Sequence, residues 1–131
     1  NTPASTLQMN YQLFSKDGLA GNGMMQLGNP DAFKLYQNYP NPFNSQTTIT
    51  YDIPSLMVNV VPVEIYIYNT IGKLVRTIDE GDKAVGTHAV MWDGKNDDGE
   101  NVSSGVYFYQ LRTKVDGQSD YNKTMKMVLV R

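Results

Sequence analysis

Apolar and polar residues alternate with a period of two along most of this chain, and this pattern limits the possible fold more than any other feature. The alternation is clearest at residues 47–53, whereas the strand-like segments 60–68, 106–115 and 120–131 carry apolar residues on both faces. Successive side chains of a β-strand point to opposite faces of its sheet, so each segment predicts a strand with a buried face. Residues 72–80 have some helical spacing, but several of them are β-branched and favour a strand instead.

Short predicted strands recur between turn signals, which indicates an all-β fold. Two more strands are expected at 73–78 and 86–92, with the polar run 79–83 leading from one to the other. The Asp-Gly pair at 116–117 predicts a two-residue hairpin turn before the last strand. In a chain of 131 residues this spacing predicts one immunoglobulin-like antiparallel β-sandwich of about seven strands.

The part of the chain that precedes these strands carries different signals. Residues 7–13 alternate like a strand, and 24–27 predict a short return strand after a glycine-rich turn. Pro40 and Pro42 predict an extended, polyproline-like segment, because proline has no backbone N–H for a sheet ladder. The chain begins with Asn1 and contains no apolar stretch approaching the roughly 18 residues of a membrane span, so we expect a piece of a longer precursor without a transmembrane segment.

Composition excludes several classes of function. The chain has no cysteine, which excludes a disulfide scaffold, a thiol nucleophile, a thiolate zinc site and an iron–sulfur cluster. With 11 Lys and Arg against 13 Asp and Glu the formal net charge is −2, and we expect no nucleic-acid partner. The one histidine, His88, lies on a predicted strand, and no Gly-x-Ser-x-Gly elbow supplies a nucleophile. We therefore expect a protein that is not an enzyme and has no cofactor.

The polar turn at 93–100 gathers four carboxylates and an asparagine, the oxygen ligands that Ca²⁺ prefers. Aligned on Gly99, however, the calcium-loop pattern needs a ligand at Gly94 and its closing Glu at Gly105. Asp, Asn and Gly also favour tight turns without metal. We expect a structural turn and a domain that folds without metal; the alternative is an irregular calcium site built with other loops.

Two pairs of tyrosines at spacing two, Tyr66 with Tyr68 and Tyr107 with Tyr109, lie on two predicted strands. An aromatic strip on one sheet face is a common way to hold sugar rings, whereas cross-strand aromatic pairs also stabilise a sheet without any ligand. Nine tyrosines against one tryptophan weaken the sugar interpretation. A non-catalytic carbohydrate-binding or spacer module of a secreted enzyme is therefore the alternative function.

Three ordered segments carry a family resemblance. They are Leu35-Tyr-Gln-Asn-Tyr-Pro-Asn-Pro-Phe-Asn44 with the following strand, Val63-Glu-Ile-Tyr-Ile-Tyr-Asn-Thr-Ile-Gly-Lys-Leu-Val-Arg76, and the closing stretch from Trp92-Asp-Gly to Lys123-Thr-Met-Lys-Met-Val-Leu-Val-Arg131. Over residues 33–131 the chain resembles the C-terminal sorting domain of the bacterial type IX secretion system. The middle and closing segments are similar also to the immunoglobulin-like domain of flagellar hook-capping proteins.

The resemblance implies a secretion signal that is recognised by the outer-membrane type IX translocon. The positions that match the family motifs, and are its candidate recognition residues, are Pro40, Asn41, Pro42, Gly72, Trp92, Gly94, Gly99, Ser104, Gly105, Tyr107, Lys123, Lys126, Met127, Val128 and Arg131. We expect the terminal strand to present the basic side chains of Lys123, Lys126 and Arg131 on one face, or its free edge, to the translocon.

The resemblance also implies a division of the chain. Residues 33–131 would form the sorting domain, and residues 1–32 an extension, a linker or the tail of a preceding cargo domain. A sortase-like peptidase would cleave within the accessible segment 28–34, and the linked cargo would pass from the periplasm to the cell surface or the medium.

Overall fold

The computed structural model describes residues 28–56, 58–115 and 120–131 as seven β-strands. The strands are β1 (Lys34–Leu35), β2 (Thr47–Ile53), β3 (Val60–Tyr68), β4 (Leu74–Ala84), β5 (Gly86–Trp92), β6 (Gly105–Thr113) and β7 (Tyr121–Leu129). The predicted bounds of β2 and β3 are confirmed. Within these described ranges, no helix is long and apolar enough to cross a membrane.

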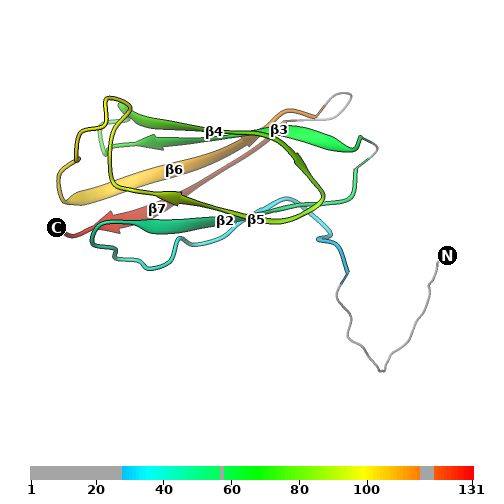
Figure 1. Ribbon diagram of the computed structural model, residues 1–131, viewed down its shortest axis with the longest axis horizontal. Helices are drawn as coiled ribbons and strands as arrows, with labels where there is room; N and C mark the ends of the chain where they lie inside the picture. Colours follow the sequence, from blue (N-terminus) through cyan, green and yellow to red (C-terminus); the bar gives the residue numbers. More distant parts are fainter. Residues whose placement is uncertain (1–27, 57, 116–119) are drawn as a thin grey trace, which may run out of the picture.

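The strands form two antiparallel sheets that pack face to face (Figure 1). One sheet has the order β1-β2-β5, and the other has the order β4-β3-β6-β7. The predicted all-β, immunoglobulin-like sandwich of seven strands is therefore confirmed.

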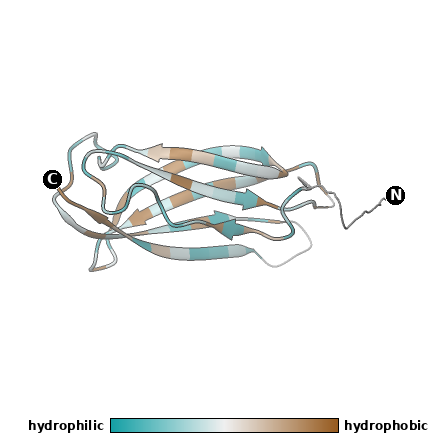
Figure 2. Ribbon diagram, turned by 90° about the horizontal axis from the view of Figure 1, so that it is seen from below, coloured by the Kyte–Doolittle hydropathy of each residue, from teal (hydrophilic) through white to brown (hydrophobic). Residues whose placement is uncertain are grey.

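The core lies between the sheets and consists of the alternating residues that the sequence pattern indicated. Hydrophobic and hydrophilic residues follow one another along the strands (Figure 2). Burying one such aliphatic side chain contributes about 1.5–3 kcal/mol. The hydrophobic side chains with at most 1% exposure are Ile49, Tyr51, Ile53, Val61, Val63, Ile65, Ile67, Trp92, Tyr109, Leu111, Met127 and Leu129.

Strand β4 is longer than expected, because it continues through the polar run 79–83 to Ala84. Those residues pair with the first half of β3, which buries Val61 and Val63 and needs a hydrogen-bonding neighbour. Glu80 is an extra residue in the ladder, since Val63 pairs with Gly81 and Glu64 with Asp79. Such a β-bulge bends the strand and increases its local twist.

Strands β6 and β7 pair antiparallel from Gly105 opposite Leu129 to Thr113 opposite Tyr121. The predicted Asp116–Gly117 turn between them lies outside the described residues, as do the strands expected at 7–13 and 24–27.

Candidate recognition site

Residues 37–44, here called the clasp, lie along the outer edge of β7 at the carboxyl-terminal end of the sandwich (Figure 1). The Phe43 N–H donates to the Val128 carbonyl at 2.9 Å, and the Val130 N–H donates to the Phe43 carbonyl at 2.8 Å. Phe43 and Leu129 thereby form a parallel bridge. The clasp adds a short pairing segment to the last strand of the larger sheet.

Polar side chains of the clasp extend this pairing. The Asn41 Oδ1 accepts from the Val128 N–H at 3.0 Å. Gln37 Nε2 donates to the Lys126 carbonyl at 2.8 Å, and Asn44 Nδ2 donates to the Val130 carbonyl at 3.3 Å. The expectation of a free edge on the terminal strand is therefore wrong over 126–130, because the clasp satisfies that edge.

The two prolines bend the clasp instead of extending it. The Tyr39–Pro40 and Asn41–Pro42 peptide bonds are both cis, and the chain bends over 40–42. The expected polyproline-like path is absent from these residues. The bend places Asn41 and Phe43 against β7.

A buried tyrosine attaches the clasp to β6. The Tyr109 hydroxyl accepts from the Asn38 N–H at 2.8 Å and donates to the Tyr36 carbonyl at 2.6 Å. Asn38 is itself buried, and its side chain donates to Thr47 Oγ1 at 2.9 Å. Burial raises the pKa of Tyr109 to about 12, so the hydroxyl remains a neutral donor at ordinary pH.

Arg131 links the end of the chain to the loops around Gly94 and Val102. Its guanidinium donates to the Val102 carbonyl at 2.7 Å and to the Gly94 carbonyl at 2.8 Å. Its backbone N–H donates to Ser104 Oγ at 2.9 Å. Gly94 has φ of +72°, and a Cβ there would lie 2.8 Å from the guanidinium, so glycine fits both the turn and the close approach.

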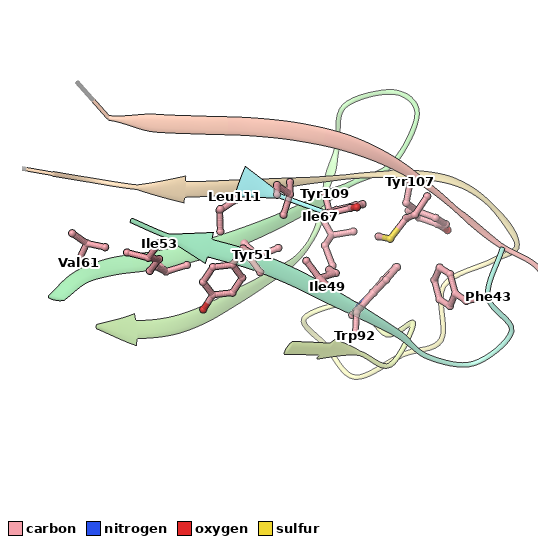
Figure 3. Close-up of a cluster of buried hydrophobic side chains, with 14 of the residues drawn as sticks. Phe43, Ile49, Tyr51, Ile53, Val61, Ile67, Trp92, Tyr107, Tyr109 and Leu111 are labelled. Atoms are coloured by element: carbon pink, nitrogen blue, oxygen red, sulfur yellow. The ribbon is translucent and has the colours of Figure 1, made fainter. Parts of the chain in front are cut away.

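Phe43, Trp92 and Tyr107 pack together in the core at this end of the sandwich (Figure 3). The Trp92 ring centroid lies 5.7 Å from those of both Phe43 and Tyr107, in tilted and edge-on arrangements. Trp92 Nε1 donates to the Lys95 carbonyl at 2.9 Å, and the Tyr107 hydroxyl donates to the Ser103 carbonyl at 2.7 Å. Met127 lies opposite Tyr107 in the ladder and is fully buried.

The polar turn after β5 uses its side chains to shape the backbone. Asn96 Oδ1 accepts from the backbone N–H groups of Asp98 and Glu100, each at 3.0 Å. Asp93 pairs with Arg76 at 3.2 Å, and Asp97 Oδ1 accepts from the Thr77 N–H at 3.0 Å. Residues 28–56, 58–115 and 120–131 contain no group of three or more His, Asp or Glu side chains placed to hold a metal ion.

The basic residues of the last strand do not share a face, so that expectation is wrong. Lys123 lies opposite the core-facing Leu111, whereas Lys126 lies opposite Phe108 on the outer face. Both side chains are exposed, and the Arg131 guanidinium is bound to carbonyl groups. Alternation along β7 separates positions that are three residues apart.

The four tyrosines also do not form one platform. Strands β3 and β6 are neighbours, but Ile67 lies opposite Tyr109 in their ladder. Tyr107 and Tyr109 therefore face the core, while Tyr66 and Tyr68 lie on the outer face of the sheet. Even there the Tyr66 ring is covered, because the Arg112 guanidinium lies 4.2 Å from its centroid.

Two further positions have local roles. Gly72 lies in the turn between β3 and β4, where its N–H donates to the Asn69 carbonyl at 3.0 Å. His88 Nε2 lies 2.8 Å from the Ala84 carbonyl, and its ring packs 5.4 Å from that of Tyr51. The Tyr51 hydroxyl donates to Glu80 at 2.7 Å. The pKa of Tyr51 is raised mainly by burial and, to a smaller extent, by this hydrogen bond.

Most of the predicted motif residues thus meet at one end of the molecule. Asn41 bonds to β7, and Arg131 bonds to Gly94 and Ser104. Trp92 packs between Phe43 and Tyr107 below them, so residues of three distant segments gather here. Sequence reasoning did not assign roles to Gln37, Asn38 and Asn44. Four amide side chains in the eight residues 37–44, around two prolines, were the available signal, but such residues also indicate ordinary loops.

Solved structures support the fold. PorU of Porphyromonas gingivalis, in its dimeric latent form, matches with a TM-score of 0.64 and 19% identity, covering 86% of this chain and 10% of that one. FlgD of P. aeruginosa matches with a TM-score of 0.53 and 26% identity, covering 63% and 60%. A weaker likeness, with a TM-score of 0.45 and 25% identity over 77% and 12%, is to PorZ, an essential surface component of the type IX secretion system of P. gingivalis.

Sequence comparison identifies a family. The basal-body rod modification protein FlgD of Salmonella typhimurium is 32% identical over 60 residues, which are 46% of this chain and 26% of that protein. The chain thus spans about a quarter of the length of this curated relative. The model of the FlgD Ig-like domain matches residues 42–117. Because that match covers more than half of the chain, this protein belongs to the FlgD Ig-like domain family.

Proposed function

We propose that this module is the C-terminal sorting signal of a secreted protein, recognised by type IX secretion machinery at the outer membrane, and that it is not an enzyme. The observation that carries the proposal is the convergence of motif residues around the terminal strand. Asn41, Ser104 and Arg131 are exposed, yet each bonds to β7 or fixes its end. Motif residues that served only the core would be buried, so these residues define a shaped surface.

The translocon would read the exposed side chains that this arrangement fixes in space. Lys126 lies beside the clasp, and Lys123 lies on the part of β7 that the clasp leaves uncovered. Charged side chains on a rigid strand guide encounter and fix register with a complementary partner. The module needs no cofactor for this role.

A sortase-like peptidase would then separate the module from its cargo, leaving the cargo at the cell surface or in the medium. Phe33 stacks on Tyr121 with ring centroids 5.0 Å apart, and Lys34 begins β1. Four of the five residues 28–32 are exposed. We therefore place the cleaved bond before Phe33, within 28–33, since a peptidase needs an accessible extended segment.

The test is export of a periplasmic reporter fused ahead of residues 33–131 in a host with type IX machinery. The variant Lys123→Glu/Lys126→Glu should fold, because surface substitutions cost little stability. It should lose export, because both proposed recognition charges are reversed. Lys73→Glu/Lys114→Glu is the matched control, since it makes the same charge change at exposed residues away from the clasp. Equal export of the two folded variants would exclude a role for the β7 lysines.

A further inference from the structure

Edge strands show where another chain can pair with this sandwich. Each sheet has two edges, β1 and β5 in the smaller sheet and β4 and β7 in the larger one. Unpaired N–H and C=O groups on an edge attract other strands, so proteins shorten, charge, bulge or cover their edges. Here β1 has two residues, and the clasp covers β7 over 126–130.

The β4 edge is protected as well. The Asp97 N–H donates to the Val75 carbonyl at 3.1 Å, and the Asp97 carboxylate accepts from the Thr77 N–H. Farther along, the bulge interrupts the strand, and Asp79 Oδ1 accepts from the Gly81 N–H at 2.9 Å. The charged residues over 79–83 also disfavour the pairing of another strand with this edge.

Strand β5 is different. On β2, the backbone groups of Thr48 and Thr50 point away from β5, because they bond to Tyr39 and Tyr36 at 2.9–3.0 Å. Alternate residues of an antiparallel strand direct their backbone groups to opposite sides. Ile49 and Tyr51 therefore direct their backbone groups toward β5, where Val90 and His88 are their register partners.

The intervening residues of β5, Thr87, Ala89 and Met91, consequently direct their N–H and C=O groups outward. All three residues are exposed, and none is charged. In the described part of the chain, no other strand or loop backbone bonds to them. Among residues 28–56, 58–115 and 120–131, nothing protects this edge in the ways found on the other three.

An acidic segment lies beside this edge. Glu80 bonds to the Tyr51 hydroxyl at 2.7 Å, and Tyr51 is the register partner of His88. His88 in turn contacts the Ala84 carbonyl, so the end of β4 lies over the inner side of β5. Residues 79–83 carry three carboxylates against one lysine. A strand added to β5 would place alternate side chains close to Glu80.

We propose that the β5 edge is a docking site for an extended partner segment that carries Lys or Arg at alternate positions. The segment would become a fourth strand of the sheet β1-β2-β5 and bond to Thr87, Ala89 and Met91. Its basic side chains would face Glu80, which fixes the register through charge. This surface is separate from the clasp, and the proposal does not depend on a role in secretion.

The test is an NMR titration of the whole 131-residue chain with the blocked peptide acetyl-Thr-Lys-Thr-Val-Thr-Lys-Thr-amide. Saturable shifts and slowed amide exchange are expected at Thr87, Ala89 and Met91. Ala89→Pro should abolish binding, because it removes an outward N–H and leaves the ladder with β2 intact. Thr124→Pro is the matched control on the uncovered part of the β7 edge and should leave binding unchanged.

Two further measurements keep the test decisive. Glu80→Gln retains an acceptor for Tyr51 and should weaken peptide binding about two- to fivefold, the range of an exposed ion pair. The same peptide N-methylated at alternate residues should not bind the unsubstituted chain. The proposal is overturned by absence of shifts at these amides at millimolar peptide, by equal binding of a peptide with Glu in place of Lys, or by concentration-dependent shifts without peptide, which would identify a second copy as the occupant.

Discussion

Tyr109→Phe is the substitution that tests the clasp most sharply, because it deletes one oxygen and keeps the ring. That oxygen accepts from the Asn38 N–H and donates to the Tyr36 carbonyl. The bond to the Tyr36 carbonyl contributes about 1 kcal/mol net, and leaving the buried Asn38 N–H without a partner costs about 1–3 kcal/mol. Asn38 is 2% exposed, so water cannot easily replace the lost hydroxyl. We expect the free energy of unfolding to fall by about 2–4 kcal/mol.

Urea unfolding followed by Trp92 fluorescence measures this change, and amide hydrogen exchange locates it. The clasp should loosen locally, so the N–H groups of Val128 and Val130 should exchange faster than in the unsubstituted protein. Tyr39→Phe is the matched control, because Tyr39 is 80% exposed and its loss of a hydroxyl should cost less than about 0.5 kcal/mol. A cost for Tyr109→Phe as small as that of the control, with unchanged exchange at Val128 and Val130, would refute the reasoning.

Three other perturbations have expected outcomes. Because burial raises the pKa of Tyr109 from 10.0 to about 12, its contribution to stability is complete below pH 10 and is lost as the pH rises toward 12; unfolding experiments across that range should show a shallower loss in Tyr109→Phe. Excess chelator should leave the melting temperature unchanged, and a drop that calcium but not magnesium reverses would assign a metal to the turn at 93–100. Gly94→Ala should destabilise the protein more than Gly99→Ala in urea unfolding, because both have positive φ but only Gly94 is packed against Arg131; equal costs would show that the contact is unimportant.

The strands could be predicted because one face of each is buried. Ile49, Tyr51 and Ile53 alternate with polar residues, and this alternation predicts a strand with these three side chains on its buried face. The strand at 79–83 was harder to predict, since the run is polar and three of its five residues are exposed. These residues form a strand because the first half of β3 requires a hydrogen-bonded neighbour. That requirement comes from β3 and cannot be seen in the sequence of 79–83.

The clasp could not be predicted, because its bonds join residues that are more than 80 positions apart. The family resemblance marked Asn41 as a candidate recognition residue, but the local sequence does not indicate that Asn41 and Asn44 bond to β7. The tyrosines show the same limit in another form. The spacing of Tyr107 and Tyr109 places them on one face of β6, but both faces of that strand are largely apolar, and the register with β3 decides which face is buried.

The sorting function is measured directly by the fraction of a reporter that leaves the periplasm when residues 33–131 are fused behind it. Matched cells with and without the type IX machinery should be compared, with folding of the fused domain checked in both. If the domain is a sorting signal, the reporter should reach the surface or the medium of cells with the machinery and remain periplasmic in cells without it. A folded fusion that stays in the periplasm of both would contradict the sorting function.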